Sequence, residues 1–304
     1  MKLYWSPRFA EHTPPAGHPE RPERAGVFAA VTAARQVAQV GVAKPRLATR
    51  EELARVHAPA YLDELESIAG RAAMLDSDTF TSPETQEVAR LAAGAAVEAA
   101  QWAFEHRTTA WALVRPPGHH AEADRAMGFC IFNNIAVAAA ALRAAGLARV
   151  AIVDIDVHHG NGTQRTFYED PAVLYASTHQ FPYYPGTGTA DEVGAGPGRG
   201  FTLNLPLEAG TTDGPFRQAF QSHVVPRLES FRPDIVLVSA GFDAHALDPL
   251  GGLRVSTEGY AAVVRMLADA AGRLCEGRMA LVTEGGYHLG ALRECLDAAM
   301  DVLS

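Results

Sequence analysis

The stretch from Ala148 to Gly162 constrains the fold and the chemistry of this chain more than any other part of the sequence. It begins as a nearly continuous apolar run, which is typical of a strand buried on both faces of a parallel sheet. Asp154, Asp156 and His158 then follow at a spacing of two, so in a continuing strand their side chains would point to one side. The sequence therefore predicts two carboxylates and an imidazole at the carboxyl end of a buried strand, where open α/β sheets bind ligands.

A bound cation would explain this cluster. Burying two carboxylates side by side costs free energy unless a cation compensates their charge. Carboxylate oxygens combined with an imidazole nitrogen suit zinc or a similar divalent ion. An Asp-x-Asp at a strand end is also a common structural feature, so the metal hypothesis depends on the added histidine and on three further stretches.

The composition narrows the class of protein. The chain has 304 residues, of which 48% are hydrophobic, and this suits one large α/β domain or two smaller ones. The net charge of −9 argues against direct nucleic-acid binding. The cysteines, Cys130, Cys275 and Cys295, have neither metal-ligand spacing nor the pattern of a disulfide framework. The amino terminus lacks an apolar signal core and no segment reaches the length of a membrane span, so we expect a cytoplasmic protein.

Apolar runs and helical patterns alternate along the chain. We expect strands over residues 3–5, 110–114, 173–177, 201–205, 234–240 and 279–283, and a central strand at the start of the 148–162 stretch. We expect helices from about residue 25, from the 82–84 segment to about residue 106, and over residues 51–70, 134–145, 163–169, 213–231, 257–275 and 290–303. This alternation predicts one domain over residues 1–304, with a mostly parallel central sheet and helices on both faces. The long loop over residues 179–200 is expected to be functional.

Three other expected strands also end in chemically reactive side chains. His119 and His120 follow one strand, Asp243 follows another, and Tyr287 follows the last. Each has a structural alternative, since the histidines could cap carbonyls, the aspartate could cap a turn and the tyrosine could simply pack. All four strand ends should nevertheless meet at one edge of a parallel sheet, and this favours a shared site.

These side chains make a consistent hydrolytic site. Asp156, His158 and Asp243 would supply three metal ligands and leave positions open, as catalytic zinc requires. The metal would acidify a water molecule and polarise a carbonyl group. A histidine near the water can act as general base and then protonate the leaving group, and Tyr287 can donate a hydrogen bond to the oxyanion. This is the equipment of a metal-dependent amide hydrolase.

With these residues placed, the sequence resembles the histone deacetylase and acetylpolyamine amidohydrolase family, and in particular its class II-like bacterial members. The motifs occur in the family's order and cover nearly the whole chain. They are His18–Arg24, Arg115–His120, Gly128–Asn134, Asp154–Gly162, Pro185–Gly188, Ser239–Asp243 and Glu284–Tyr287. The resemblance implies a deacetylase-type α/β domain, related to arginase, that binds Zn²⁺ through the three ligands named above.

The resemblance also assigns roles around the metal. It implies that His120 is the proton-shuttling general base and acid, with His119 as its electrostatic partner. Asp154 would hold His119, Asn161 would hold His120, and Tyr287 would polarise the scissile carbonyl.

Further roles follow from the same resemblance. Phe129 and Tyr184 would form the walls of an acyl-lysine tunnel, Gly128 would accept the substrate amide hydrogen bond, and Arg24 would line an internal exit channel. Family members also bind structural K⁺, and the matching residues are Asp154, Asp156, His158 and Ser177, with a second site near Phe167 and Val173.

Some positions depart from the family pattern and bear on substrate choice. His288 stands where many members have Asn, and Tyr184 replaces the commoner Phe. Polyamine-selective members of one branch carry an acidic residue where this chain has Leu250, which favours an acyl-lysine substrate. Asp78 and Glu122 are acidic side chains that could still reach the rim.

Several functions therefore stay open at this point. The leading hypothesis is a zinc-dependent deacylase acting on an acylated lysine in a protein or peptide. A deacetylase of polyamines or other small acetylated amines shares the chemistry, and a non-catalytic ligand-binding protein is a third alternative. A binuclear arginase-like hydrolase is disfavoured because extra bridging carboxylates are not evident. The sequence leaves homo-oligomer formation open.

Overall fold

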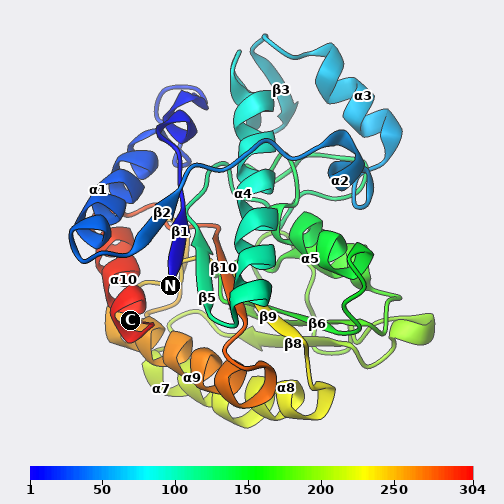
Figure 1. Ribbon diagram of the computed structural model, residues 1–304, viewed down its shortest axis with the longest axis vertical. Helices are drawn as coiled ribbons and strands as arrows, with labels where there is room; N and C mark the ends of the chain where they lie inside the picture. The colour runs from blue at the N-terminus through cyan, green and yellow to red at the C-terminus, as the bar shows by residue number, and fades with distance from the viewer. Residues whose placement is uncertain (304) are drawn as a thin grey trace.

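An eight-stranded sheet, in which every neighbouring pair of strands is parallel, forms the centre of the molecule (Figure 1). The structure is a computed structural model and describes residues 1–303. From edge to edge the strands are β2 (Gly41–Ala43), β1 (Lys2–Tyr4), β5 (Thr109–Ala112), β10 (Met279–Thr283), β9 (Ile235–Ala240), β6 (Val150–Asp154), β7 (Val173–Gln180) and β8 (Thr202–Leu207). The predicted parallel α/β sheet in a single domain is thereby confirmed.

Two hydrophobic layers cover the two faces of this sheet. Along β6, Val150 and Ile152 pack into one layer and Ala151 and Val153 into the other, because successive side chains of a strand alternate between faces. The first layer lies under α2 (Arg50–Ala54), α3 (Pro59–Ser67), α4 (Thr85–His106), α5 (Asn134–Ala144) and α6 (Asn161–Phe167). The second lies under α1 (Glu23–Val37), α7 (Asp213–Ala219), α8 (Val225–Phe231), α9 (Thr257–Cys275) and α10 (Leu289–Val302).

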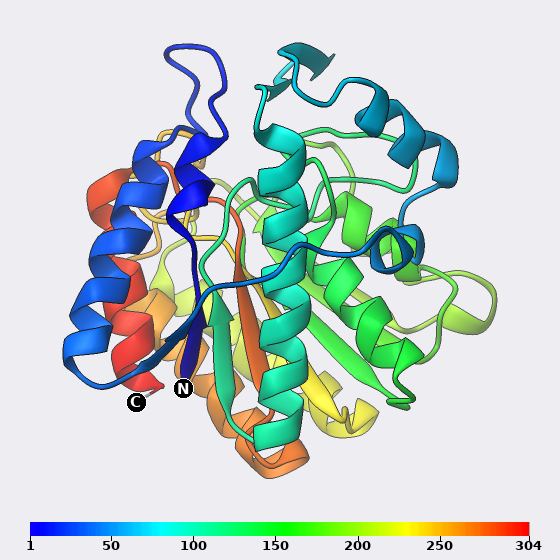
Figure 2. The same ribbon diagram turned by 45° about the horizontal axis from the view of Figure 1, so that its top comes forward.

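The longest helix, α4, passes in front of β5 and β10 in both views (Figures 1 and 2). Its buried face is mostly alanine, which lets the helix approach the sheet and α5 closely. The segment that leads from β2 to α2 crosses the outside of α4 at Gly94, where a Cβ atom would collide with the backbone of Leu47 and Ala48. The Ala48 N–H donates a hydrogen bond of 2.8 Å to the Arg90 carbonyl and holds the crossing in place.

The boundaries of most expected elements agree with the structure, but the helix expected over residues 51–70 is wrong. That region contains two helices, α2 and α3, separated by a turn. Ala58 is extended, with φ −62° and ψ 142°, because the ring of Pro59 disfavours helical backbone in the residue before it. The proline then occupies the first turn of α3, where its missing N–H costs nothing.

The helical region over residues 213–231 contains a wider turn that the sequence pattern does not predict. A π-helical segment, Phe220–Val224, separates α7 from α8. Pro226 lies just after it and cannot donate to a carbonyl one turn earlier, which accounts for the local widening.

Several short elements were also not expected. They are β2, a hairpin of β3 (Ala73–Asp76) and β4 (Thr79–Thr81), and short 3₁₀ helices at Pro7–Glu11 and Gly196–Gly198. Elements of three to five residues contain too little periodicity to be recognised in a sequence. Among residues 1–303, no helix is long and apolar enough to cross a membrane. The three cysteines are buried and unpaired with one another.

Candidate active site

Two carboxylates and one imidazole converge beyond the ends of β6 and β9. Asp156, His158 and Asp243 each offer a ligand atom, and these atoms lie within 4.8 Å of one another. His158 Nδ1 is 3.1 Å from Asp156 Oδ1 and 3.3 Å from Asp243 Oδ2. Burial, together with the neighbouring charge of Asp156, raises the pKa of Asp243 to about 7. Two buried carboxylates this close repel each other unless a positive charge or a proton lies between them.

The donor set fits a divalent metal ion. Asp243 Oδ2 is buried and has no hydrogen-bond partner among the described residues 1–303. A buried carboxylate oxygen without a partner is costly unless it has a ligand. Two carboxylate oxygens and an imidazole nitrogen match the ligand types of catalytic zinc sites, which keep a further position open.

The backbone turns away from the strand direction after Asp154. The expectation that Asp154, Asp156 and His158 continue one strand is therefore wrong. β6 ends at Asp154. The Asp154 carboxylate accepts the Asp156 N–H at 3.2 Å, and the Asp156 carboxylate accepts the His158 N–H at 2.9 Å. These side-chain bonds occupy the N–H groups of Asp156 and His158 beyond the end of β6, so the loop rather than a strand orients the side chains.

Glycines in two neighbouring loops let the backbone approach the carboxylates of Asp156 and Asp243. A Cβ atom at Gly241 would collide with the side chain of Asp156, and one at Gly285 would collide with that of Asp243. Gly285 also donates its N–H to Asp156 Oδ2 at 2.9 Å. Substituting either glycine would therefore displace the carboxylate that its Cβ atom meets.

His119 and His120 lie beside the triad with their ring centroids 4.1 Å apart. His119 Nδ1 is 3.0 Å from Asp154 Oδ2, and His120 Nδ1 is 2.8 Å from Asn161 Oδ1. Burial would lower the pKa of His119, but Asp154 and Asp156 outweigh it and raise that pKa to about 10. Burial and the charges of His119 and His158 hold the pKa of His120 well below its usual range. The neighbouring carboxylates thus favour the charged form of His119, whereas burial and the adjacent histidines favour the neutral form of His120.

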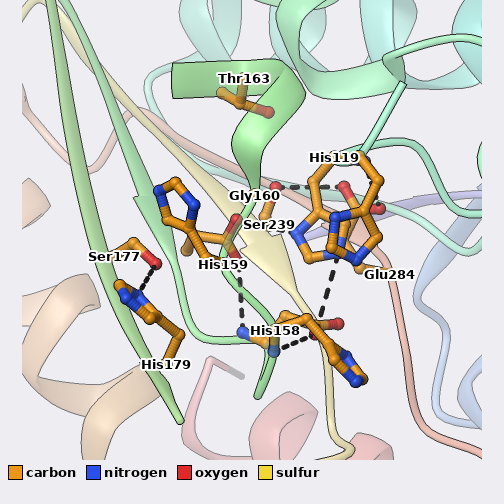
Figure 3. A network of polar contacts seen from close by, with 12 residues as sticks. His119, His158, His159, Gly160, Thr163, Ser177, His179, Ser239 and Glu284 are labelled. Carbon is orange, nitrogen blue, oxygen red and sulfur yellow. Dashed lines mark hydrogen bonds and ion pairs between the residues drawn. The ribbon is translucent and has the colours of Figure 1, made fainter. Parts of the chain in front are cut away.

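Glu284 fixes the backbone of the loop that carries His119 and His120. The sequence patterns do not single out its side chain. Its carboxylate accepts the Gly118 N–H at 2.6 Å, the His119 N–H at 3.2 Å and the Ser239 hydroxyl at 3.1 Å. Figure 3 shows His119 beside Glu284, with Ser239 close by. Burial raises the pKa of Glu284 to about 7. The residue lies within the Glu284–Tyr287 motif, which was the available signal for it.

A cavity of about 190 Å³ opens above the triad. Its lining residues come from six separate loops, and they are Asp78, His120, Gly128, Phe129, His158, Tyr183, Tyr184, Leu250 and Tyr287. Aromatic rings form much of the wall, with the Tyr184 ring edge-on to His120 at 5.1 Å and the Tyr183 ring stacked on His158 at 5.7 Å. The structure thus brings His120, His158 and Tyr287 together at a narrow aromatic cavity.

Gly128 and Phe129 shape one wall of this cavity through left-handed backbone, with φ angles of 57° and 69°. A Cβ atom at Gly128 would collide with the His120 ring. The Phe129 N–H donates to Thr79 Oγ1 at 3.0 Å, which ties this wall to the β3–β4 hairpin.

Contacts to both the backbone and the ring of Tyr287 fix its position. Its N–H donates to Asp248 Oδ2 at 2.6 Å, and its ring lies edge-on to Phe129 at 5.6 Å. The guanidinium of the fully buried Arg24 lies 5.0 Å from the ring centroid and donates to the Gly286 carbonyl at 2.8 Å. Burial holds the pKa of the Tyr287 hydroxyl well above its usual range, despite Arg24, so the phenol remains a donor.

The residues matched to potassium sites lie behind the triad. Asp154 and Ser177 are fully buried partners in the register of β6 and β7. The Ser177 hydroxyl contacts His179 Nδ1 at 2.9 Å (Figure 3). Phe167 ends α6, and Val173 begins β7.

Among the acidic side chains considered for the rim, Asp78 lines the cavity and Glu122 does not. Glu122 is buried on the far side of Asn161. Leu250 therefore shares the cavity lining with an acidic residue. Asp78 lies between β3 and β4, and these short strands were not recognised in the sequence.

Comparison with known proteins places this fold and site in a family. A family model described as the histone deacetylase domain matches residues 18–303. Histone deacetylase 15 of Arabidopsis thaliana is 43% identical over 295 residues, covering 94% of this chain and 52% of that protein. The histone deacetylase-like amidohydrolase of Pseudomonas aeruginosa is 41% identical over 298 residues, covering 95% of this chain and 77% of that protein.

A solved structure, that of the HDA15 HD domain, is also similar to this chain. It superposes with a TM-score of 0.94 at 41% identity, covering 100% of this chain and 90% of that chain. This chain spans about half the length of the Arabidopsis protein. From the match to the family model across nearly all its residues, the chain belongs to the histone deacetylase domain family.

Proposed function

We infer that this chain is a zinc-dependent deacylase that hydrolyses the amide of an acylated lysine side chain or a similar acylated amine. The observation that carries this inference is the convergence of the Asp156, His158 and Asp243 ligand atoms at a cavity that His120 and Tyr287 also line. Those three residues would hold the zinc, which when bound acidifies a water molecule and polarises a carbonyl group. The family membership and the names of the relatives support the same reaction class.

The protein side chains have separate tasks in this mechanism. Neutral His120 takes a proton at Nε2 from the attacking water as the new C–O bond forms, and it then delivers that proton to the nitrogen of the leaving amine as the amide C–N bond breaks. His119, paired with Asp154, keeps a positive charge next to His120. Tyr287 donates its hydroxyl hydrogen to the developing oxyanion.

The cavity walls determine what enters. Phe129 and Tyr184 would flank the methylene chain of an acyl-lysine, and the Gly128 carbonyl would accept the substrate amide N–H. Arg24 would line an exit path behind the site, where it already contacts the Glu284 and Gly286 carbonyls. We also propose a structural K⁺ near Asp154, Asp156, His158 and Ser177. A second K⁺ is proposed near Phe167 and Val173.

The substrate class has a second candidate. Asp78 puts a carboxylate in the cavity lining, and no salt bridge to Asp78 occurs among residues 1–303. A carboxylate that has no ion-pair partner could bind the second ammonium of a small acetylated amine such as acetylspermidine. Leu250 in the same lining favours the acyl-lysine of a peptide, which needs no such partner. A cytoplasmic location and any homo-oligomer stay predictions from the sequence.

Hydrolysis assays on protein of measured zinc content test the proposed function. The substrates are an acetyl-lysine peptide and acetylspermidine, with His120→Ala and His119→Ala as variants. We expect His120→Ala to lose about 10²–10⁴-fold in turnover, because it removes the general base, and His119→Ala to lose much less. Near-full activity in His120→Ala, or no hydrolysis of either substrate by zinc-loaded wild type, would overturn the proposal.

A further inference from the structure

A buried carboxylate lies one hydrogen bond behind the residue that holds His120. Glu122 is nearly inaccessible to solvent, and its Oε1 accepts a hydrogen bond of 2.8 Å from Asn161 Nδ2. Asn161 Oδ1 in turn lies 2.8 Å from His120 Nδ1. Glu122, Asn161 and His120 therefore form a chain of hydrogen bonds that ends at the ring which lines the cavity.

The surroundings of Glu122 keep its carboxylate ionised. Arg165 Nη1 donates to Oε2 at 2.6 Å, and Arg125 Nη2 lies 3.0 Å from Oε1. Burial alone would raise the pKa of Glu122, but Arg125, Asn161 and Arg165 outweigh it and lower that pKa. An ionised carboxylate has acceptor oxygens and no donor.

The acceptor-only character of Glu122 determines which way the Asn161 amide faces. The Asn161 NH₂ group must point at Glu122, since the opposite orientation would set the amide oxygen against a carboxylate oxygen. Two weaker contacts of the same nitrogen, at 3.4 Å to the His120 carbonyl and to Met127 Sδ, are compatible with this orientation. The Asn161 carbonyl oxygen is thereby directed at His120 Nδ1.

The amide orientation in turn selects one tautomer of neutral His120. A carbonyl oxygen accepts a hydrogen bond, so Nδ1 carries the hydrogen and Nε2 keeps its lone pair. We propose that Glu122 is a positioning residue that orients Asn161 and so keeps His120 in the Nδ1–H tautomer, with Nε2 free to act as a base. The catalytic consequence rests on the proposed function.

Glu122 acts from outside the substrate cavity. It does not line the 190 Å³ cavity, and it instead borders a separate surface cavity of about 420 Å³ together with Arg125, Asn161 and Arg165. A change at Glu122 therefore leaves the substrate walls intact. Its effect should fall on turnover rather than on substrate binding.

Glu122→Gln is the informative substitution. The glutamine oxygen is expected to stay with Arg165, the shortest charged contact, which turns the glutamine NH₂ group toward Asn161. Asn161 then presents its oxygen to Gln and its NH₂ group to His120, which favours the Nε2–H tautomer and removes the lone pair of the base. We expect kcat to fall about 10–100-fold, as is usual for residues that orient a catalytic group from behind, with KM nearly unchanged.

A double variant separates the change of His120 tautomer from a general loss of structure caused by the substitution. In Glu122→Gln with Asn161→Asp, residue 161 offers an acceptor oxygen to His120 Nδ1 in either orientation, so the Nδ1–H tautomer and most of the lost kcat should return. Arg125→Gln is the matched control, because it removes an exposed charge partner of Glu122 and keeps the acceptor. Its tautomer and kcat should match those of the wild type.

The test reads the tautomer directly, by ¹⁵N NMR of the histidine rings in zinc-loaded protein, with His120 assigned by comparison with His120→Ala. The wild-type spectrum must show Nδ1–H, and an Nε2–H form in the wild type overturns the proposal even if the variants fail to fold. An unchanged tautomer or kcat in folded Glu122→Gln, or no recovery in the double variant, also overturns it. The NMR readout needs no substrate, so an inactive wild type would refute the proposed function without deciding this one.

Discussion

Replacing the buried Glu20 by glutamine should destabilise the fold strongly. Glu20 is fully buried and binds Arg115 with two hydrogen bonds of 2.8 Å, and its Oε1 also accepts from Arg24 at 3.0 Å. Burial would raise the pKa of Glu20, but Arg115, His12 and Arg24 hold it well below its usual range. Glu20→Gln keeps the size of the side chain and leaves two buried guanidinium groups without their counter-charge.

The magnitude follows from the burial of this cluster. Removing one partner of a buried ion pair typically costs about 3–5 kcal/mol, because the remaining charge stays desolvated. A chain of 304 residues with an unfolding entropy of about 2.1 cal/mol/K per residue loses about 1.6 °C of Tm for each kcal/mol. We therefore expect Tm to fall by about 5–8 °C.

Thermal unfolding followed by circular dichroism at pH 7 measures this loss. Asp63→Asn is the control, because its ion pair with Arg50 is 68% and 44% exposed and should contribute less than about 1 kcal/mol. The folded-state pKa of Glu20 is depressed, so its contribution is present above the unfolded pKa and declines as the pH falls through the folded value. A Tm for Glu20→Gln equal to that of Asp63→Asn would refute the reasoning.

Three further predictions concern the site and its support. Tyr287→Phe should lower kcat by about 10²–10³-fold with zinc content unchanged, and a change confined to KM would place Tyr287 on the cavity wall instead. Asp243→Asn should lose zinc on dialysis under conditions where the wild type keeps about one equivalent, measured by mass spectrometry. Burial lowers the pKa of His57 from 6.5 to about 4. The free energy of unfolding should therefore fall by up to about 3 kcal/mol as the pH drops from about 6.5 to about 4. His57→Gln should lack this acid sensitivity in urea titrations, and an equal pH dependence in both proteins would contradict it.

The strand ends of the site could be predicted because local sequence encodes them. The apolar runs of β6, β9 and β10 are recognisable from neighbouring residues alone, and a parallel sheet places their carboxyl ends at one edge. This reasoning predicts that the loops carrying Asp156 and Asp243 approach each other. It also predicts the helices with clear caps, such as α9, whose observed bounds match the expectation.

Contacts between loops could not be predicted in this way. The Asp78 carboxylate lines the cavity because a short hairpin packs beside Phe129, and the Glu122 carboxylate reaches Asn161 across 39 positions of the chain. Such contacts depend on how distant segments pack, which leaves no periodicity in either segment.

The sequence by itself therefore determined the parallel sheet, the edge where the site lies and the chemistry-bearing residues at the strand ends. Tertiary structure alone decided the bend after Asp154, the burial of Glu122 and the presence of Asp78 at the cavity. The physical reason is that local propensity and alternation act between near neighbours, whereas hydrogen bonds and burial between loops are set by the packed sheet as a whole.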